Sequence, residues 1–139
     1  MIEFKNVSFS YVKDKEKQFV VMYETLAEAI EKNNITDEET VNNIFVLAAK
    51  NNMFFLVVNT WEQAVYSNVP NTDELTQQLY EFMLNQSPAN DRVLRRTDFY
   101  EITQTQVRSG NIGNLRLRGN LGNGCYVIIS SPLESIHES

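Results

Sequence analysis

The side chains best suited to recognising a small anion lie close together in one segment of the chain. Arg95 and Arg96 are adjacent, and Asp98 and Tyr100 follow within a few residues. A guanidinium group presents a planar fork of N–H donors that matches a carboxylate bidentately, so the two arginines are candidates for clamping an anionic ligand. Pairing with surface carboxylates is the commoner use of such arginines in a net acidic protein, so this alternative stays open.

Further polar side chains extend this candidate ligand site. Tyr100, Gln104 and Tyr126 lie in segments that we expect to be strands, where they can offer polar contacts inside a pocket. Packing on the face of the sheet is the usual alternative for such residues. Arg116 and Arg118 alternate with leucines and therefore share one face of a strand, which we expect to be solvated.

The composition gives little support for metal, thiol or acid–base chemistry. His137 is the single histidine and Cys125 the single cysteine, so the Cys/His patterns of zinc sites do not occur. Cys125 lies in an expected strand, where a free cysteine usually packs as a small hydrophobe. The strand carboxylates Glu62 and Glu101 lie at positions expected to face solvent. We therefore expect neither a metal nor another cofactor.

The length and charge of the chain narrow the class of protein. With 139 residues and 42% apolar composition, the chain is expected to form one globular domain over residues 1–139. Its 18 acidic and 12 basic side chains give a net charge of −6, which argues against binding to duplex nucleic acid. No run approaches the roughly 18 consecutive apolar residues of a membrane span.

Apolar residues at steps of three and four predict helices over about 11–33 and 36–50, and a third helix after the break at 69–73. A capping box of Thr36 and Glu39 is expected to start the second helix, and Asn71 or Thr72 to cap the third. The inward stripe of the first helix is expected to be Phe19, Met22, Tyr23, Leu26 and Ile30.

Strand patterns predict an α+β fold with a five-stranded, mostly antiparallel sheet, a long N-terminal helix and flanking helices. The expected strands cover 53–59, 61–67, about 99–107, 114–118 and 124–130. An Asn-Gly pair within 119–124 predicts a tight hairpin turn, because both central positions of such a turn need positive φ. A PAS-like sensor fold and a cone-shaped fold of the nuclear-transport-factor type both fit, and the helix after the second strand favours the PAS-like fold.

Residues 98–102 and 114–139 resemble the extracytoplasmic sensor region of bacterial two-component histidine kinases, which is PAS-like (Cache-type). The most specific part runs from the Gly-Asn-Leu-Gly-Asn-Gly segment at 119–124 into Pro-Leu-Glu-Ser-Ile at 132–136. Weaker similarity at 11–26 and 47–66 extends the resemblance over roughly residues 11–139. Residues 1–10 alternate as a strand does, which conflicts with a helix leaving a membrane, and their origin stays open.

The resemblance implies a signal-input domain that detects a small-molecule or peptide ligand, or a state, outside the cytoplasm. The signal would pass through the terminal segments to the kinase of a parent protein anchored in the bacterial cell membrane. The resemblance implies no catalysis by this chain itself. It also implies a ligand site between the sheet and the helix after the second strand, for which the candidates are Arg95, Arg96, Tyr100, Gln104 and Tyr126.

Two alternatives of other classes stay open. One is a small cone-fold enzyme with a carboxylate and a tyrosine in a closed pocket. The other is a ligand-free module for dimerisation or protein interaction. Pairing of two copies through the long N-terminal helix is compatible with this module and with the sensor.

Overall fold

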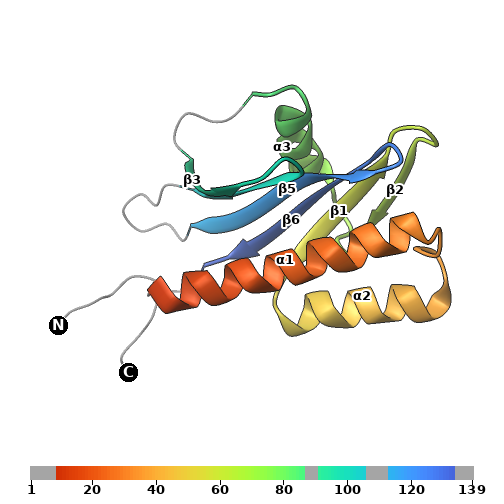
Figure 1. Cartoon of the computed structure of the whole chain (residues 1–139), viewed down its shortest axis with the longest axis horizontal. Coiled ribbons are helices and arrows are strands. Elements are labelled where there is room, and N and C mark those ends of the chain that lie inside the picture. Colours follow the sequence, from red (N-terminus) through yellow and green to blue (C-terminus); the bar gives the residue numbers. More distant parts are fainter. Residues whose placement is uncertain (1–8, 87–90, 106–112, 134–139) are drawn as a thin grey trace.

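The computed structural model describes residues 9–86, 91–105 and 113–133. Within them the chain forms three helices and one six-stranded antiparallel sheet, an α+β architecture (Figure 1). The helices are α1 (Phe9–Glu31), α2 (Glu38–Lys50) and α3 (Asp73–Met83), and the strands are β1 (Phe54–Asn59), β2 (Ala64–Ser67), β3 (Arg92–Arg96), β4 (Tyr100–Gln104), β5 (Asn114–Gly122) and β6 (Cys125–Pro132). Residues 1–8 and the stretch 134–139 with His137 lie outside the described residues.

The strands are ordered β2-β1-β6-β5-β4-β3 across the sheet, so β6 and β5 lie at its centre. The sheet separates two helical layers (Figure 1). Helices α1 and α2 lie side by side against one face, and α3 packs against the other face. We call these the α1 face and the α3 face.

The α1 face holds the larger part of the core. The predicted stripe of α1 is buried at four positions, and Ile30 is half-buried against the same core. These side chains pack on alternate residues of the central strands, because a strand directs every second side chain to the same face. The strand residues of this core are Phe55, Val57, Tyr100, Ile102, Leu115, Leu117, Leu121, Cys125, Val127 and Ile129.

The α3 face holds a smaller apolar cluster. Leu56 and Val58 of β1 and Ile128 of β6 pack against Leu79 of α3. Half-buried side chains of α3 border this cluster, and they are Leu75, Phe82 and Met83. Both faces of β1 are therefore covered, as the continuous apolar run of this strand predicts.

Asparagines in the left-handed conformation follow each helix. Asn33, Asn52 and Asn85 have φ of 57°, 55° and 58°, a region that asparagine tolerates better than most residues. Backbone amides just beyond the helices reach back to carbonyls of the last turn, as from Asn34 N to Ala29 O at 3.0 Å. The chain thus leaves each helix abruptly.

The predicted hairpin turn between the last two strands is confirmed. Asn123 and Gly124 have φ of 54° and 80° and join β5 to β6 as the two central turn residues. This turn sets the pairing of Leu117 with Ile129 and of Arg118 with Ile128 along the hairpin.

The prediction of five strands is wrong, because the structure has six. The additional strand is β3, which pairs with β4 through a turn at Thr97, whose Oγ1 accepts from the amides of Phe99 and Tyr100 at 3.1 Å. This edge strand escapes sequence analysis because only Leu94 of its five residues packs against the core, so no apolar alternation marks it. The predicted strand 99–107 is described only to residue 105, and β4 ends at Gln104.

The predicted capping box is also wrong. Helix α2 begins after Asp37 as its N-cap, and the N-cap side chain makes no capping hydrogen bond. Thr72 is the N-cap of α3, as one of the two predicted alternatives. The side-chain contact at this start comes from Asn71, whose Oδ1 accepts from the amide of Asp73 at 3.0 Å.

Replacement of Leu26 by alanine tests the orientation of α1. Leu26 is fully buried against the sheet, so Leu26→Ala is expected to lower the free energy of unfolding by about 2–5 kcal/mol in urea titrations. Val21, on the same helix, is 50% exposed, and Val21→Ala is expected to change the free energy by less than about 0.5 kcal/mol. Equal losses from the two variants would contradict the packing described here.

Candidate functional site

A buried ionic cluster lies on the α3 face of the sheet. Arg118 of β5 and Glu101 of β4 occupy paired positions on neighbouring strands, and both are buried. Arg118 Nη2 lies 3.7 Å from Glu101 Oε2, and Arg96 of β3 places its Nη2 3.4 Å from Glu101 Oε1. The side chain of Arg96 is 62% exposed, so the cluster runs from the protein surface into its interior.

Helix α3 closes the cluster above Arg118. Arg118 Nη1 donates to the backbone carbonyl of Gln78 at 3.2 Å, and its guanidinium carbon lies 6.0 Å from the centre of the Phe82 ring. A cation over an aromatic face is attracted by the ring quadrupole, and more strongly where water is excluded. The guanidinium of Arg118 is thus held between the sheet and α3.

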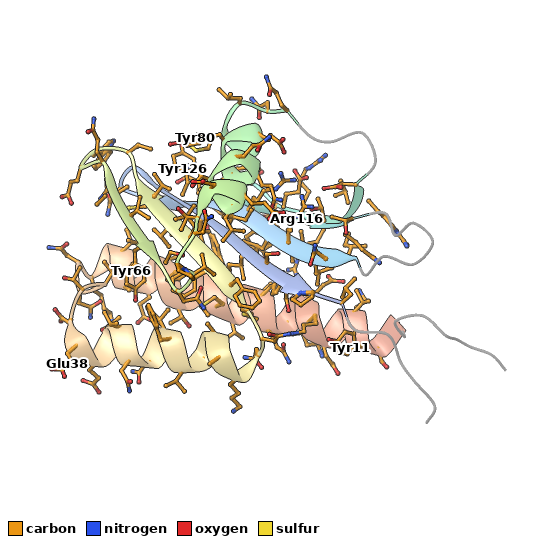
Figure 2. The ribbon with its side chains drawn as sticks, turned by 180° about the vertical axis from the view of Figure 1, so that it is seen from behind. Tyr11, Glu38, Tyr66, Tyr80, Arg116 and Tyr126 are labelled. Atoms are coloured by element: carbon orange, nitrogen blue, oxygen red, sulfur yellow. The ribbon has the colours of Figure 1, made fainter. Side chains whose placement is uncertain are left out.

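A second ion pair extends the cluster along β5. Arg116 Nη1 lies 3.4 Å from Asp91 Oδ2, and both side chains are largely buried. Arg116 pairs with Thr103 of β4 and lies on the α3 face, two residues before Arg118 (Figure 2). The cluster therefore contains three arginines, two carboxylates and one threonine, which are Arg96, Arg116, Arg118, Asp91, Glu101 and Thr103.

Several polar atoms of this cluster have no hydrogen-bond partner among the described residues. They are Nε and Nη2 of Arg118, Oε2 of Glu101 and Oγ1 of Thr103. Buried polar atoms are normally paired, because leaving one unpaired costs about 1–3 kcal/mol. Burial lowers the pKa of the Arg118 guanidinium, while the carboxylate of Glu101 opposes this effect.

The structure divides the five predicted ligand residues between the two faces of the sheet. Tyr100 faces α1, where its ring centre lies 4.9 Å from that of Tyr23, and the guanidinium carbon of Arg95 lies 5.8 Å from the centre of the Tyr100 ring. Gln104 is half-buried on the same face of β4, four residues after Tyr100. These three residues belong to the side of the sheet that α1 covers.

The other two predicted residues lie on the α3 face. Arg96 contacts Glu101, as described above. Tyr126 is half-buried against the apolar cluster beneath α3 (Figure 2). Tyr126 pairs with Asn120 near the hairpin turn, at some distance along the sheet from Arg96. The five predicted ligand residues therefore do not form one site. Arg95 lies near Tyr100 on the α1 face, and Arg96 belongs to the buried cluster on the α3 face.

The expectation that Arg116 and Arg118 form a solvated face is wrong. Arg118 is 0% exposed and Arg116 is largely buried, because α3 covers this face. The expectation that Glu101 faces solvent is also wrong, because Glu101 is buried, whereas Glu62 is exposed as expected. The sequence feature that indicates this burial is the row of apolar residues along α3, which consists of Leu75, Leu79, Phe82 and Met83. A helix with such an apolar face packs against another element, here one face of the sheet.

Cys125 is buried on the α1 face, as predicted for a small hydrophobe. Burial raises the pKa of its thiol, and the nearby Glu62 carboxylate raises it further. Among the described residues, no group of three or more histidine, cysteine, aspartate and glutamate side chains is arranged to hold a metal ion. The same part of the chain contains no helix long and apolar enough to cross a membrane.

The outer side of α3 carries an open groove. Its lining residues are Asp73, Thr76, Gln77, Tyr80, Glu81, Leu84 and Gln86. None of the residues of the buried cluster lines this groove.

Comparisons with known protein families, with curated proteins and with solved structures found no match for this chain. The feature that calls for a functional explanation is the buried cluster, where a fully enclosed guanidinium keeps donors without partners in the described part of the protein.

Replacement of Glu101 by glutamine tests the electrostatic role of the cluster. Glu101→Gln removes the carboxylate beside the buried Arg118, and breaking a buried pair from one side is costly, so we expect a loss of about 3 kcal/mol in the free energy of unfolding. The matched control is Glu28→Gln, which breaks a shorter pair with Lys32 at 2.8 Å whose partners are both 61% exposed. We expect a much smaller change there, because solvent screens exposed pairs. A larger loss in the control would contradict this account.

Proposed function

We propose that this chain is a PAS-like (Cache-type) signal-input domain of a bacterial membrane-bound histidine kinase, lying outside the cytoplasm. It detects a small-molecule or peptide ligand and has no catalytic activity of its own. The resemblance over residues 11–139 supports this proposal. The position of α3 also supports it, because this helix follows the second strand and covers one sheet face, where sensors of this kind bind their ligands.

The main structural support for the proposal is the position of the first residues of α1 and the last residues of β6. Helix α1 begins and strand β6 ends at the same end of the molecule (Figure 1). A sensor domain that passes its signal through both terminal segments needs this arrangement. The membrane or the kinase module that receives the signal lies on one side of the domain, so both segments must leave the domain on that side. A relative shift of α1 and β6 then becomes a signal at that end.

A physical route joins the two faces of the sheet. Strands β5 and β6 contribute side chains to the core under α1 and also to the face under α3. A ligand that binds beneath α3 would act on the same strands against which α1 packs. The resulting shift is limited by the difference in affinity of the ligand for the two arrangements.

The two alternatives receive less support. The cone-fold enzyme needs a carboxylate free to act in a closed pocket, whereas the buried Glu101 lies within ion-pair distance of two arginines. The dimerisation module needs an apolar outer face on α1. That face carries Asp14, Lys17, Glu24 and Glu28 around the half-exposed Val21. Homodimerisation through α1 stays a prediction.

A thermal-shift screen tests the proposal. The chain is unfolded in the presence of amino acids, organic acids, peptides, sugars and metal ions, with buffers matched in charge and ionic strength. A ligand present at about 100 times its dissociation constant is expected to raise Tm by several degrees, because it binds only the folded state. A screen in which no class of compound shifts Tm would count against a ligand-dependent sensor and favour the protein-interaction module.

A further inference from the structure

We propose that strand β3 is a docking edge for an extended acidic segment of a partner protein, which pairs with β3 as an additional strand of the sheet. The backbone of the segment forms hydrogen bonds along the outer side of β3, and its carboxylates contact Arg92 and Arg95. These two arginines lie away from the buried cluster beneath α3, and the docking does not depend on the proposed sensor function.

The backbone of β3 has one open side. β3 is the last strand of the sheet, and among the described residues it pairs only with β4. The N–H and C=O groups directed away from β4 therefore have no strand beside them in this part of the chain. Such a row of backbone groups is a template for pairing with a strand of another chain.

β3 is strongly basic in a protein that is acidic overall. Its 5 residues include three arginines, whereas the whole chain has 12 basic and 18 acidic side chains. All three arginines are exposed, and Arg96 contacts Glu101. The ion pairs of the described residues include neither Arg92 nor Arg95. These two guanidinium groups are therefore available to the carboxylates of a partner strand, since opposite charges on neighbouring strands attract.

The arginines of β3 lie on both faces of the sheet. Arg92 pairs with Gln104 and Arg95 lies beside the Tyr100 ring, so both are on the α1 face, whereas Arg96 is on the α3 face. A strand added to β3 directs alternate side chains to the two faces, so its carboxylates reach arginines on either side. A membrane surface would meet mainly one face. This distribution favours an extended peptide as the partner.

Exposed apolar side chains border the basic edge. Val93 of β3 is 44% exposed, and Phe99, in the turn between β3 and β4, is 64% exposed. Aromatic side chains are enriched in protein–protein interfaces. The edge thus offers apolar contacts beside its charges.

The charge of β3 also disfavours a second copy of this chain as the occupant. In an antiparallel pair of two β3 strands, the arginines of both copies would lie side by side, and like charges on opposite strand positions are destabilising. The other edge strand, β2, has the sequence Ala-Val-Tyr-Ser and offers no carboxylate to the arginines. The complementary occupant is therefore an acidic strand from a different protein.

The test uses the whole chain and a synthetic peptide of about eight residues in which glutamate and threonine alternate, blocked at both ends. We expect isothermal titration to detect binding that weakens with added salt, because the attraction between exposed charges is screened. The same peptide with glutamine in place of glutamate is expected to show no measurable binding. A version methylated on its backbone nitrogens keeps the carboxylates and loses the donors, and it is expected to bind at least about tenfold more weakly.

Paired variants locate the contact on β3. The double variant Arg92→Gln with Arg95→Gln is expected to weaken binding at least about fivefold, because each carboxylate–guanidinium pair contributes to the complex. The matched control is Lys17→Gln with Lys50→Gln, which removes the same charge from exposed positions of α1 and α2 and is expected to change the affinity less than about twofold. All four side chains are exposed, so both variants are expected to keep the Tm of the unmodified protein.

Hydrogen exchange shows whether the peptide adds as a strand. In the complex, backbone amides of β3 are expected to exchange more slowly with solvent, because the added strand accepts their hydrogen bonds. The amides of β2, at the opposite edge of the sheet, are expected to exchange at an unchanged rate.

The outcomes decide the docking edge separately from the sensor function. Binding that needs the carboxylates, the peptide donors and the two arginines, with slower exchange in β3, supports the inference. Equal affinity of the methylated peptide overturns strand addition, and so does slower exchange in β2 alone. Equal losses in the arginine and lysine variants overturn the assignment to β3. Absence of binding by the acidic peptide overturns the inference as a whole, while the thermal-shift screen still tests the sensor.

Discussion

The alternation of side chains along β5 is the constraint on which both sides of the sheet depend, the apolar core under α1 and the ionic cluster under α3. Leu115, Leu117 and Leu121 turn towards α1 and complete the core, while Arg116 and Arg118 turn towards α3. A shift of one residue in the pairing of β5 would place the guanidinium groups in the apolar core. The Asn123–Gly124 turn helps to exclude this slip, because it ties the register of β5 to that of the buried strand β6.

Burial of Arg118 follows from this constraint and from the need to cover the second sheet face. The apolar residues of β1 and β6 on that face require a cover, and the stripe of α3 provides it. The same helix then encloses the arginine beside that cluster. Taking a charge out of water is expensive unless groups of the protein compensate it. Around Arg118 these groups are the carboxylate of Glu101, the backbone carbonyl of Gln78 and the ring of Phe82.

The sequence predicts structural features that depend on the spacing of neighbouring residues. It does not predict features that depend on contacts between residues far apart in the chain. The buried stripe of α1 and the Asn-Gly turn follow from spacing and backbone preference. Strand β3 gives no such signal, because it lies at the sheet edge with one inward side chain. The burial of Arg118 depends on Gln78 and its helix, 40 residues away in sequence, and alternation within β5 cannot reveal that cover.

The most direct measurement of the central claim is nuclear magnetic resonance of the arginine side chains. If Arg118 is enclosed beneath α3, its Nε–H proton exchanges slowly with water and shows a nuclear Overhauser effect to the Phe82 ring. This resonance disappears in Arg118→Lys, and the exposed Arg95 exchanges rapidly by comparison. An Arg118 proton that exchanges as fast as that of Arg95, with no contact to Phe82, would contradict the account.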